Sequence, residues 1–306
     1  GKTRVLTHRI AYLMQEKGIS PFEILALTFT NKAAREMKER VETLAGERGN
    51  HVWISTFHAC CARMLRIDIE RLGGFTRDFV IYDDTDQLAV LTEVQKEMNV
   101  AEERLPKRAL RALFSEAKNR SMEPAEYIRD QGRANGALEM EAFDIYQKKL
   151  RQNNALDFDD LLGRTLELFQ TVPEVLEKYQ QRFRYIHVDE YQDTNQPQYV
   201  FVRALAAKYR NLCVVGDDDQ SIYGWRGADI ENILGFERDY PDAAVIRLEQ
   251  NYRSSQNILS AANHVIDHNI ARKRKKLWTD AGDGERIGLY SAWSERDEAD
   301  FVCRSI

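Results

Sequence analysis

Short apolar runs, separated by amphipathic segments, constrain the fold of this 306-residue chain more than any other feature. A continuous apolar run bounded by polar turns is typical of a strand that is buried on both faces, as in a parallel sheet. Amphipathic helices are predicted after Thr3 and from Asn31, which is a good helix N-cap. This alternation predicts an α/β fold with a parallel sheet and helices on both of its faces. The predicted strands span residues 24–29, 52–57, 185–188, 212–215 and 244–248.

Between about residues 85 and 155 the sequence changes character, because charge-rich helical segments dominate and no convincing strand is found. The predicted helices span residues 84–98, 103–119 and 138–152. We therefore expect a helical insertion, residues 85–155, in an α/β domain made of residues 1–84 and 156–245. Residues 246–306 are predicted to begin a second domain.

Composition excludes several classes of protein. The formal net charge is -5, so bulk charge does not indicate nucleic-acid binding, which would need a local groove. No apolar run reaches the roughly 18 residues of a membrane-spanning helix, and no signal peptide is visible. The four cysteines include no C-x-x-C pair. They indicate neither a zinc site nor a disulfide framework, and they fit a reducing cytoplasm.

Gly1, Lys2 and Thr3 match the last three residues of the phosphate-binding loop G-x-x-x-x-G-K-[ST]. We therefore expect the chain to be a fragment that lacks an upstream strand and glycine-rich loop. In such a loop Lys2 would reach the β- and γ-phosphates of ATP, and the Thr3 hydroxyl would coordinate Mg²⁺. The helix that starts here would favour an anion at its N-terminus. The tripeptide alone is a weak signal, and it gains weight from the ordered motifs that follow it.

Asp189 and Glu190 directly follow the predicted strand at residues 185–188. Two adjacent carboxylates at the end of a buried strand are costly unless they serve a cation. Asp189 would hold the metal ion, usually through water, and Glu190 would orient or deprotonate the attacking water. An ordinary acidic loop is the alternative, but the longer run Val-Asp-Glu-Tyr-Gln-Asp-Thr-Asn favours the catalytic interpretation.

Two further segments contain residues suited to act on a γ-phosphate. Gln220 follows the predicted strand at 212–215, where an amide can sense whether that phosphate is present. Arg253 is suited to the role of an arginine finger, and Tyr252 beside it to stacking on adenine, although such a pair alone is usually structural. The carboxylates of residues 217–219 form a solvated turn or a two-metal nuclease site, and the absence of a second nearby cluster favours the turn.

Together these motifs resemble the superfamily 1 DNA helicases of the UvrD/PcrA/Rep type, over essentially the whole chain. The stretches that carry the resemblance are T-F-T-N-K-A-A at 28–34, S-T-F-H at 55–58, L-D-F-D-D at 156–160, V-D-E-Y-Q-D-T at 188–194, G-D-D-D-Q-S-I-Y-G-W-R-G at 216–227 and Q-N-Y-R-S at 250–254. The resemblance implies an ATP-driven motor that translocates 3′ to 5′ on single-stranded DNA and separates duplexes at junctions, in repair or replication. It also implies two RecA-like domains that clamp ATP, of which the first carries a helical insertion and the second is only begun here.

The resemblance also implies the residues of two sites. The nucleotide site, for ATP and Mg²⁺, would consist of Gly1, Lys2, Thr3, Asp189, Glu190, Gln220, Arg226, Tyr252 and Arg253. The residues that touch the DNA strand would be Phe29, His58, Phe158, Tyr223 and Trp225.

The aromatic residues among these have a physical reason of their own to bind DNA. Phe29, Phe158, Tyr223 and Trp225 lie in or beside polar loops at strand ends, where a core aromatic is not expected. Stacking of bases on such rings contributes roughly 1–3 kcal/mol per base with little sequence preference. The alternative is that each ring packs onto its own domain. The basic run at 272–276 is a solvated face, with phosphate contacts that would lack sequence preference.

The sequence departs from the helicase pattern at both ends, because the first P-loop glycines and the later motifs of a second motor domain are absent. We therefore expect this chain to hydrolyse ATP weakly or not at all. Two alternatives stay open: a nucleic-acid-binding module without turnover, and the motor part of a helicase-nuclease of the RecB/AddA kind. The sequence does not indicate protein partners.

Overall fold

The computed structural model describes the whole chain except residues 123, 133–134 and 270–274. The described residues form two compact units, one of residues 2–243 and one of residues 244–306 together with Gly1. Among the described residues, none of the helices could span a lipid bilayer. Part of the basic run predicted to contact phosphates lies outside the described residues.

A parallel sheet lies at the centre of the first unit. Its four strands lie in the order β2 (Trp53–Thr56), β1 (Ile24–Thr28), β5 (Tyr185–Val188) and β6 (Leu212–Val214). All three pairings are parallel. These are four of the five predicted strands, so the α/β fold with a parallel sheet is confirmed.

Helices cover both faces of this sheet, as the fully buried strand β1 requires. Ile24 and Ala26 point toward α1 (Lys2–Gln15) and α2 (Asn31–Ala45), where they join a buried cluster with Leu6 of α1. The alternate residues Leu25 and Leu27 join a larger cluster on the opposite face. That cluster is built with α3 (Phe57–Asp68), α8 (Phe158–Thr171), α9 (Pro173–Arg182) and α10 (Gln196–Ala206).

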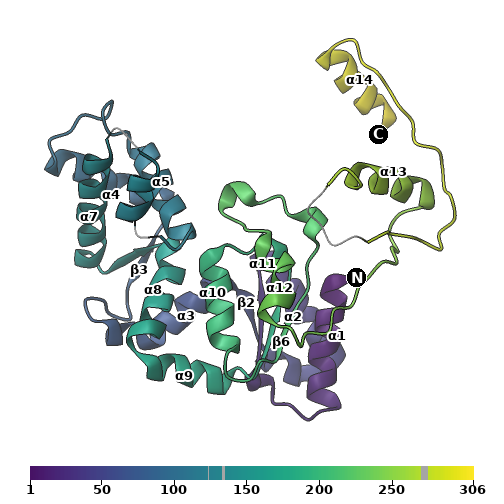
Figure 1. Cartoon of the computed structure of the whole chain (residues 1–306), viewed down its shortest axis with the longest axis horizontal. Coiled ribbons are helices and arrows are strands. Elements are labelled where there is room, and N and C mark those ends of the chain that lie inside the picture. Colours follow the sequence, from purple (N-terminus) through teal and green to yellow (C-terminus); the bar gives the residue numbers. More distant parts are fainter. Residues whose placement is uncertain (123, 133–134, 270–274) are drawn as a thin grey trace. The chain divides into compact units, whose positions relative to one another are not determined.

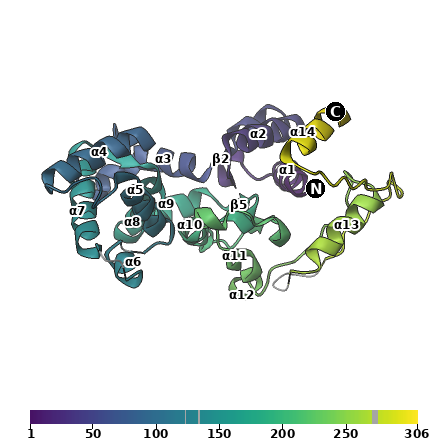
Figure 2. The ribbon, with the colours of Figure 1, turned by 90° about the horizontal axis from the view of Figure 1, so that it is seen from above.

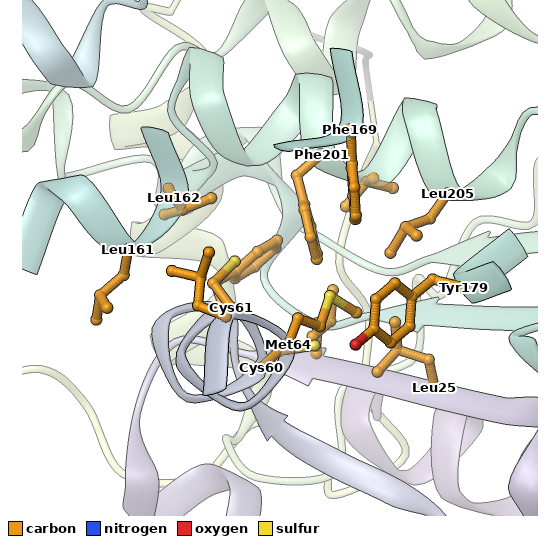
Figure 3. Packing of buried hydrophobic residues seen from close by; sticks show 14 of the residues in the cluster. Leu25, Cys60, Cys61, Met64, Leu161, Leu162, Phe169, Tyr179, Phe201 and Leu205 are labelled. Atoms are coloured by element: carbon orange, nitrogen blue, oxygen red, sulfur yellow. The ribbon is translucent and has the colours of Figure 1, made fainter. Parts of the chain in front are cut away.

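The larger cluster is a dense core of aliphatic, aromatic and sulfur-containing side chains (Figure 3). Phe169 and Phe201 stack with their ring centroids 5.9 Å apart, and full burial of such a side chain contributes roughly 1.5–3 kcal/mol. Cys60 and Cys61 are completely buried here, and burial raises the pKa of the Cys61 thiol to about 12. These two cysteines therefore act as small hydrophobic residues rather than as reactive thiols.

A helical subdomain with its own core interrupts the α/β layer. It consists of α4 (Asp84–Glu97), α5 (Lys107–Asn119), α6 (Pro124–Asp130) and α7 (Gly136–Gln152), which gather at one end of the unit (Figures 1 and 2). Three of these helices correspond to those expected from the sequence. A two-stranded parallel sheet of β3 (Val80–Tyr82) and β4 (Ala155–Asp157) joins the two ends of this stretch and was not predicted.

Two short helices, α11 (Glu231–Leu234) and α12 (Phe236–Asp239), complete the first unit. The second unit contains α13 (Gln256–Ile266) and α14 (Glu295–Ser305), and an isolated bridge pairs Gln250 with Trp278.

Two local predictions are wrong. Residues 244–248 form no strand, and the side chains of Val245, Ile246 and Leu248 are largely exposed. An apolar run becomes a strand only beside a hydrogen-bonding neighbour, and no strand pairs with this run in the described part of the chain. The N-cap of α2 is Thr30 rather than Asn31, because the Thr30 side chain accepts a hydrogen bond from the Ala33 amide.

Candidate nucleotide and nucleic-acid site

The first turn of α1 meets the carboxyl end of β5, although 186 positions separate them in the sequence. The Thr3 hydroxyl donates a hydrogen bond of 2.9 Å to Asp189 Oδ2. The ammonium group of Lys2 lies 3.0 Å from Glu190 Oε2. Four of the predicted nucleotide-site residues are therefore in direct contact, and their roles at that site stay predictions.

The backbone of β5 determines how the two carboxylates diverge. The Asp189 amide donates to the Leu27 carbonyl at 2.9 Å, which extends the pairing with β1 by one residue. Glu190 then adopts a left-handed conformation with φ 49° and ψ 45°. Such a conformation is uncommon for a residue other than glycine and concentrates at functional sites. Glu190 therefore leaves the strand abruptly, toward Lys2.

The electrostatics of this contact suit a phosphate and a divalent cation. Asp189 is 3% exposed, and burial raises the pKa of its carboxyl although the hydrogen bond from Thr3 opposes this rise. The Lys2 Nζ is buried, and among the described residues its 3.0 Å ion pair with Glu190 is not joined by a hydrogen bond to any other group. An ammonium with unused donors fits a phosphate, and the hydroxyl and carboxylate oxygens of Thr3 and Asp189 fit Mg²⁺.

Gln192 joins this pair to the next loop and was not among the predicted site residues. Its side-chain amide donates to Glu190 Oε2 at 3.1 Å, and its Oε1 accepts from the Asp217 amide at 2.9 Å. A Cβ on Gly216 would lie 2.7 Å from that Oε1 and 2.5 Å from Ile233 Cδ1, so these side chains would have to shift to accommodate a larger residue. The polar run after β5 was the only sign in the sequence that Gln192 could belong to the site. Its bonding partner Asp217 lies 25 positions further along the chain, so the sequence did not show this contact.

Asp193 is a second group of this loop with an unusual environment. Its Oδ1 is buried without a hydrogen-bond partner. Burial, and then the charge of Glu190, raises the pKa of the Asp193 carboxyl to about 6. The loop after β5 therefore carries more negative charge than its described partners neutralise, which suits a site for a cation.

Gln220 ends the short 3₁₀ turn η5 (Asp218–Gln220) and is exposed. Its side-chain amide donates to the Asp217 carboxylate within the same turn. Carboxylate oxygens of Asp217, Asp218 and Asp219 lie within 4.8 Å of one another, and Asp217 caps the turn by accepting from the Asp219 amide. The structure thus gives this acidic run a local role as a turn, and the sensing role of Gln220 stays a prediction.

Four of the predicted DNA-contacting aromatic residues form two pairs, whereas Phe29 packs on Phe57 with the ring centroids 5.5 Å apart. Trp225 is 73% exposed, and its ring centroid lies 6.5 Å from that of Tyr223. Phe158 is 51% exposed and stacks on His58 at 4.0 Å. Phe29 is half-buried and packs on the larger core. The exposed ring surfaces of Trp225 and Phe158 are suited to stacking on a base, whereas less of the Phe29 ring is exposed.

His58 is neutral at physiological pH, because burial lowers the pKa of its imidazole to about 4. Any contact of His58 with DNA would therefore depend on stacking or on a hydrogen bond rather than on a positive charge.

A buried polar network that the sequence did not predict joins α5 to the start of α8 and to the N-terminus of α10. The Lys118 ammonium contacts Asp157 Oδ2 at 2.5 Å and Asp160 Oδ1 at 2.8 Å. Its neighbour Asn119 donates to Asp159 Oδ1 at 3.1 Å and accepts from the Asn195 side chain at 2.6 Å. Asn195 is the N-cap of α10. The helical subdomain is therefore hydrogen-bonded both to the L-D-F-D-D segment and to the segment after Glu190.

Tyr252 and Arg253 belong to the second unit. Tyr252 is 80% exposed, and its hydroxyl donates to Gln250 Oε1 at 2.7 Å. The amides of Arg253 and Ser254 both donate to Asn251 Oδ1 at 2.9 Å, which fixes the turn. The Arg226 side chain lies outside the described part of the structure. The nucleotide-site roles of these residues and of Gly1 stay predictions.

Comparison with known proteins gives a consistent result. The UvrD/REP helicase N-terminal domain family matches residues 1–241, and the UvrD-like helicase C-terminal domain family matches residues 246–306. Proteins described as ATP-dependent DNA helicase PcrA, from Staphylococcus aureus and from Staphylococcus epidermidis, are 55% identical over 306 residues. The match covers 100% of this chain and 42% of each relative, so the chain spans less than half of their length.

Proposed function

Since this chain belongs to the UvrD/REP helicase family, we propose that it forms the ATP-binding part of an ATP-dependent DNA helicase. The observation that carries the proposal is the contact of Lys2 and Thr3 with Asp189 and Glu190. This contact joins the first turn of α1 to the two carboxylates that directly follow β5. That arrangement is the one that phosphoryl transfer from a nucleoside triphosphate requires.

Each of these residues has a distinct task in this proposal. Lys2 binds the β- and γ-phosphates, and Thr3 and Asp189 hold Mg²⁺, which neutralises charge that develops on the phosphate oxygens. Glu190 orients the attacking water and accepts its proton. Its ion pair with Lys2 is exchanged for a Lys2–phosphate contact when ATP binds. Gln220 senses the γ-phosphate.

Domains and location follow from the same proposal. Residues 1–84 and 156–245 form a first RecA-like motor domain, residues 85–155 form its helical insertion, and residues 246–306 begin a second motor domain. Tyr252 of the second domain stacks on adenine, and Arg253 stabilises the transferring phosphoryl group. The enzyme works in the cytoplasm, in keeping with four free cysteines.

Single-stranded DNA is the proposed track of the motor. The exposed rings of Trp225, Tyr223 and Phe158 supply stacking platforms, with Phe29 and His58 beside them. Trp225 directly precedes Arg226, so a base that stacks on the ring shifts the position of an arginine suited to the γ-phosphate. Movement is 3′ to 5′, and it separates duplexes at junctions.

The role of Glu190 is tested by the substitution Glu190→Gln. The assay uses a protein that contains this chain and has the full length of the helicase relatives. We expect ATP hydrolysis to fall by at least about 100-fold, because the general base contributes on the order of 10²–10⁴ to the rate. ATP should still bind, since Lys2, Thr3 and Asp189 are unchanged. Single-turnover hydrolysis and binding of a fluorescent ATP analogue separate the two effects.

A matched control is Glu231→Gln, at the exposed start of α11 and outside the proposed site, which should hydrolyse ATP at the normal rate. Normal turnover by Glu190→Gln would contradict the role given to Glu190.

The direction of movement is tested with partly single-stranded duplexes. We expect the protein to displace a strand from duplexes with a 3′ tail but not from those with a 5′ tail.

A further inference from the structure

A cavity of about 350 Å³ lies beside β2, on residues that the proposed motor function does not use. β2 is an edge strand, since β1 is its only neighbour in the sheet order. Its outer side therefore keeps backbone groups that no strand pairs with in the described chain. The walls of the cavity come from β2, from α2 and α3, and from the end of α9.

Positive charge gathers around this cavity. Its lining includes the cations Lys38, Arg63 and Arg182, with His51 beside them, and it includes no aspartate or glutamate. The chain as a whole carries a formal charge of -5, so this composition is a local feature of one edge of the sheet. A concave surface lined by one sign of charge concentrates ligands of the opposite sign.

Two of these cations share one aromatic ring. The guanidinium carbons of Arg63 and Arg182 lie 3.9 Å and 5.0 Å from the ring centroid of Trp53, which is 5% exposed. Neither guanidinium makes a hydrogen bond or an ion pair with another residue of the described chain, and the Arg182 Nε is buried without a partner. Stacking on indole fixes both groups in place.

Arrangement and charge together indicate the ligand. Both guanidinium groups line the same cavity, and they have hydrogen-bond donors that no described residue uses. An anion in the cavity could accept hydrogen bonds from these donors. Guanidinium donors match the oxygen spacing of a phosphate, and the volume of the cavity is at the small end of the range for ligand pockets, about 300–1,000 Å³.

We infer that this cavity is a binding site for a phosphate group, which Arg63 and Arg182 hold and which Lys38 and His51 approach from the rim. The phosphate belongs either to the backbone of a nucleic acid or to a small free phosphate or phosphate ester. The site is distinct from the proposed nucleotide site, because none of the residues of that site lines the cavity.

The test is calorimetric titration of inorganic phosphate into the 306-residue chain at constant ionic strength, in a Lys2→Ala background. Lys2→Ala removes the main phosphate contact of the nucleotide site, so the two sites do not overlap in the measurement. We expect this variant to bind phosphate, and Arg63→Gln or Arg182→Gln to weaken that binding by at least about tenfold. Arg63→Lys, which keeps the charge and loses the forked donors, should give an intermediate loss.

Arg66→Gln is the matched control. Arg66 lies on the same helix as Arg63, and its guanidinium stacks on Phe79 at 3.8 Å, but it does not line the cavity. Binding should be unchanged in Arg66→Gln, and near-identical circular dichroism of all variants checks that each has folded.

A second titration with a single-stranded oligonucleotide identifies the source of the phosphate. A parallel loss of oligonucleotide binding in Arg182→Gln supports the site with a DNA backbone as its ligand. A loss for inorganic phosphate alone supports the site with a free phosphate. Absence of phosphate binding in the Lys2→Ala chain would overturn the inference, and so would binding that ignores Arg63 and Arg182. An acidic peptide that binds at these arginines while phosphate does not would also overturn it.

Discussion

His187 illustrates at the scale of one residue how burial can dominate a property of the protein. It lies in the middle of β5, between Ala26 of β1 and Cys213 of β6, and is 1% exposed. Neither ring nitrogen has a hydrogen-bond partner in the described structure. Burial, with a smaller contribution from the charge of Arg9, lowers the pKa of His187 to about 3. The folded protein therefore keeps this ring neutral.

A pH dependence of stability follows from this shift. In the unfolded chain the ring takes up a proton as the pH falls below its ordinary pKa of 6.5, and in the folded chain it does so only near 3. The contribution of the neutral His187 ring to the free energy of unfolding is therefore fully present above about pH 6.5. It is lost progressively as the pH falls toward 3. Between pH 7 and pH 5 we expect His187 to account for a loss of about 2 kcal/mol. Urea unfolding at both values measures it.

His187→Leu should remove that part of the pH dependence, because leucine cannot bind the proton. The exposed His8 is the control, and His8→Leu should keep the pH dependence of the unchanged protein. An equal slope in His187→Leu and in the unchanged protein would contradict this account.

At the scale of elements, sequence patterns predicted the strands that are continuous apolar runs and the helices that are amphipathic. The strands of the main sheet are apolar runs between two helical layers, fully buried in the central strand β1 and less so in the edge strand β6. β3 was missed because it is three residues long and its Val80 and Ile81 are exposed, so neither alternation nor a continuous run marks it. Residues 244–248 have the apolar run but no partner strand in the described chain.

Capping of α2 gives a prediction at this scale. Thr30→Ala should lower the free energy of unfolding by about 1 kcal/mol, because the Ala33 amide loses its acceptor at the start of the helix. Asn31→Ala should leave it nearly unchanged, since Asn31 is the first residue of the helix rather than its cap. Urea unfolding of both variants provides the comparison. A larger loss in Asn31→Ala than in Thr30→Ala would show that the cap has been misassigned.

For the whole molecule, motifs identified which segments meet but not how they are joined. Lys2 and Glu190 were predicted for one site, and their contact agrees with that grouping. Gln192 and Asn119 were missed, because their partners are set by the packing of segments 25 and 76 positions apart. No periodicity or local motif encodes such contacts. Asn119 ties the helical subdomain to the cap of α10, so this network links the proposed DNA and ATP sites.

Coupling between DNA and ATP is the central claim, and DNA-stimulated ATP hydrolysis measures it most directly. The assay compares a protein of the full length of its helicase relatives with its Trp225→Ala and Tyr12→Ala variants, where Tyr12 is an exposed ring of α1 outside the proposed DNA site. We expect strong stimulation by single-stranded DNA in the unchanged protein and in Tyr12→Ala. Trp225→Ala should need about tenfold more DNA for half-maximal stimulation, since one stacking contact is lost. Equal rates with and without DNA, or stimulation that is unchanged in Trp225→Ala, would contradict the account.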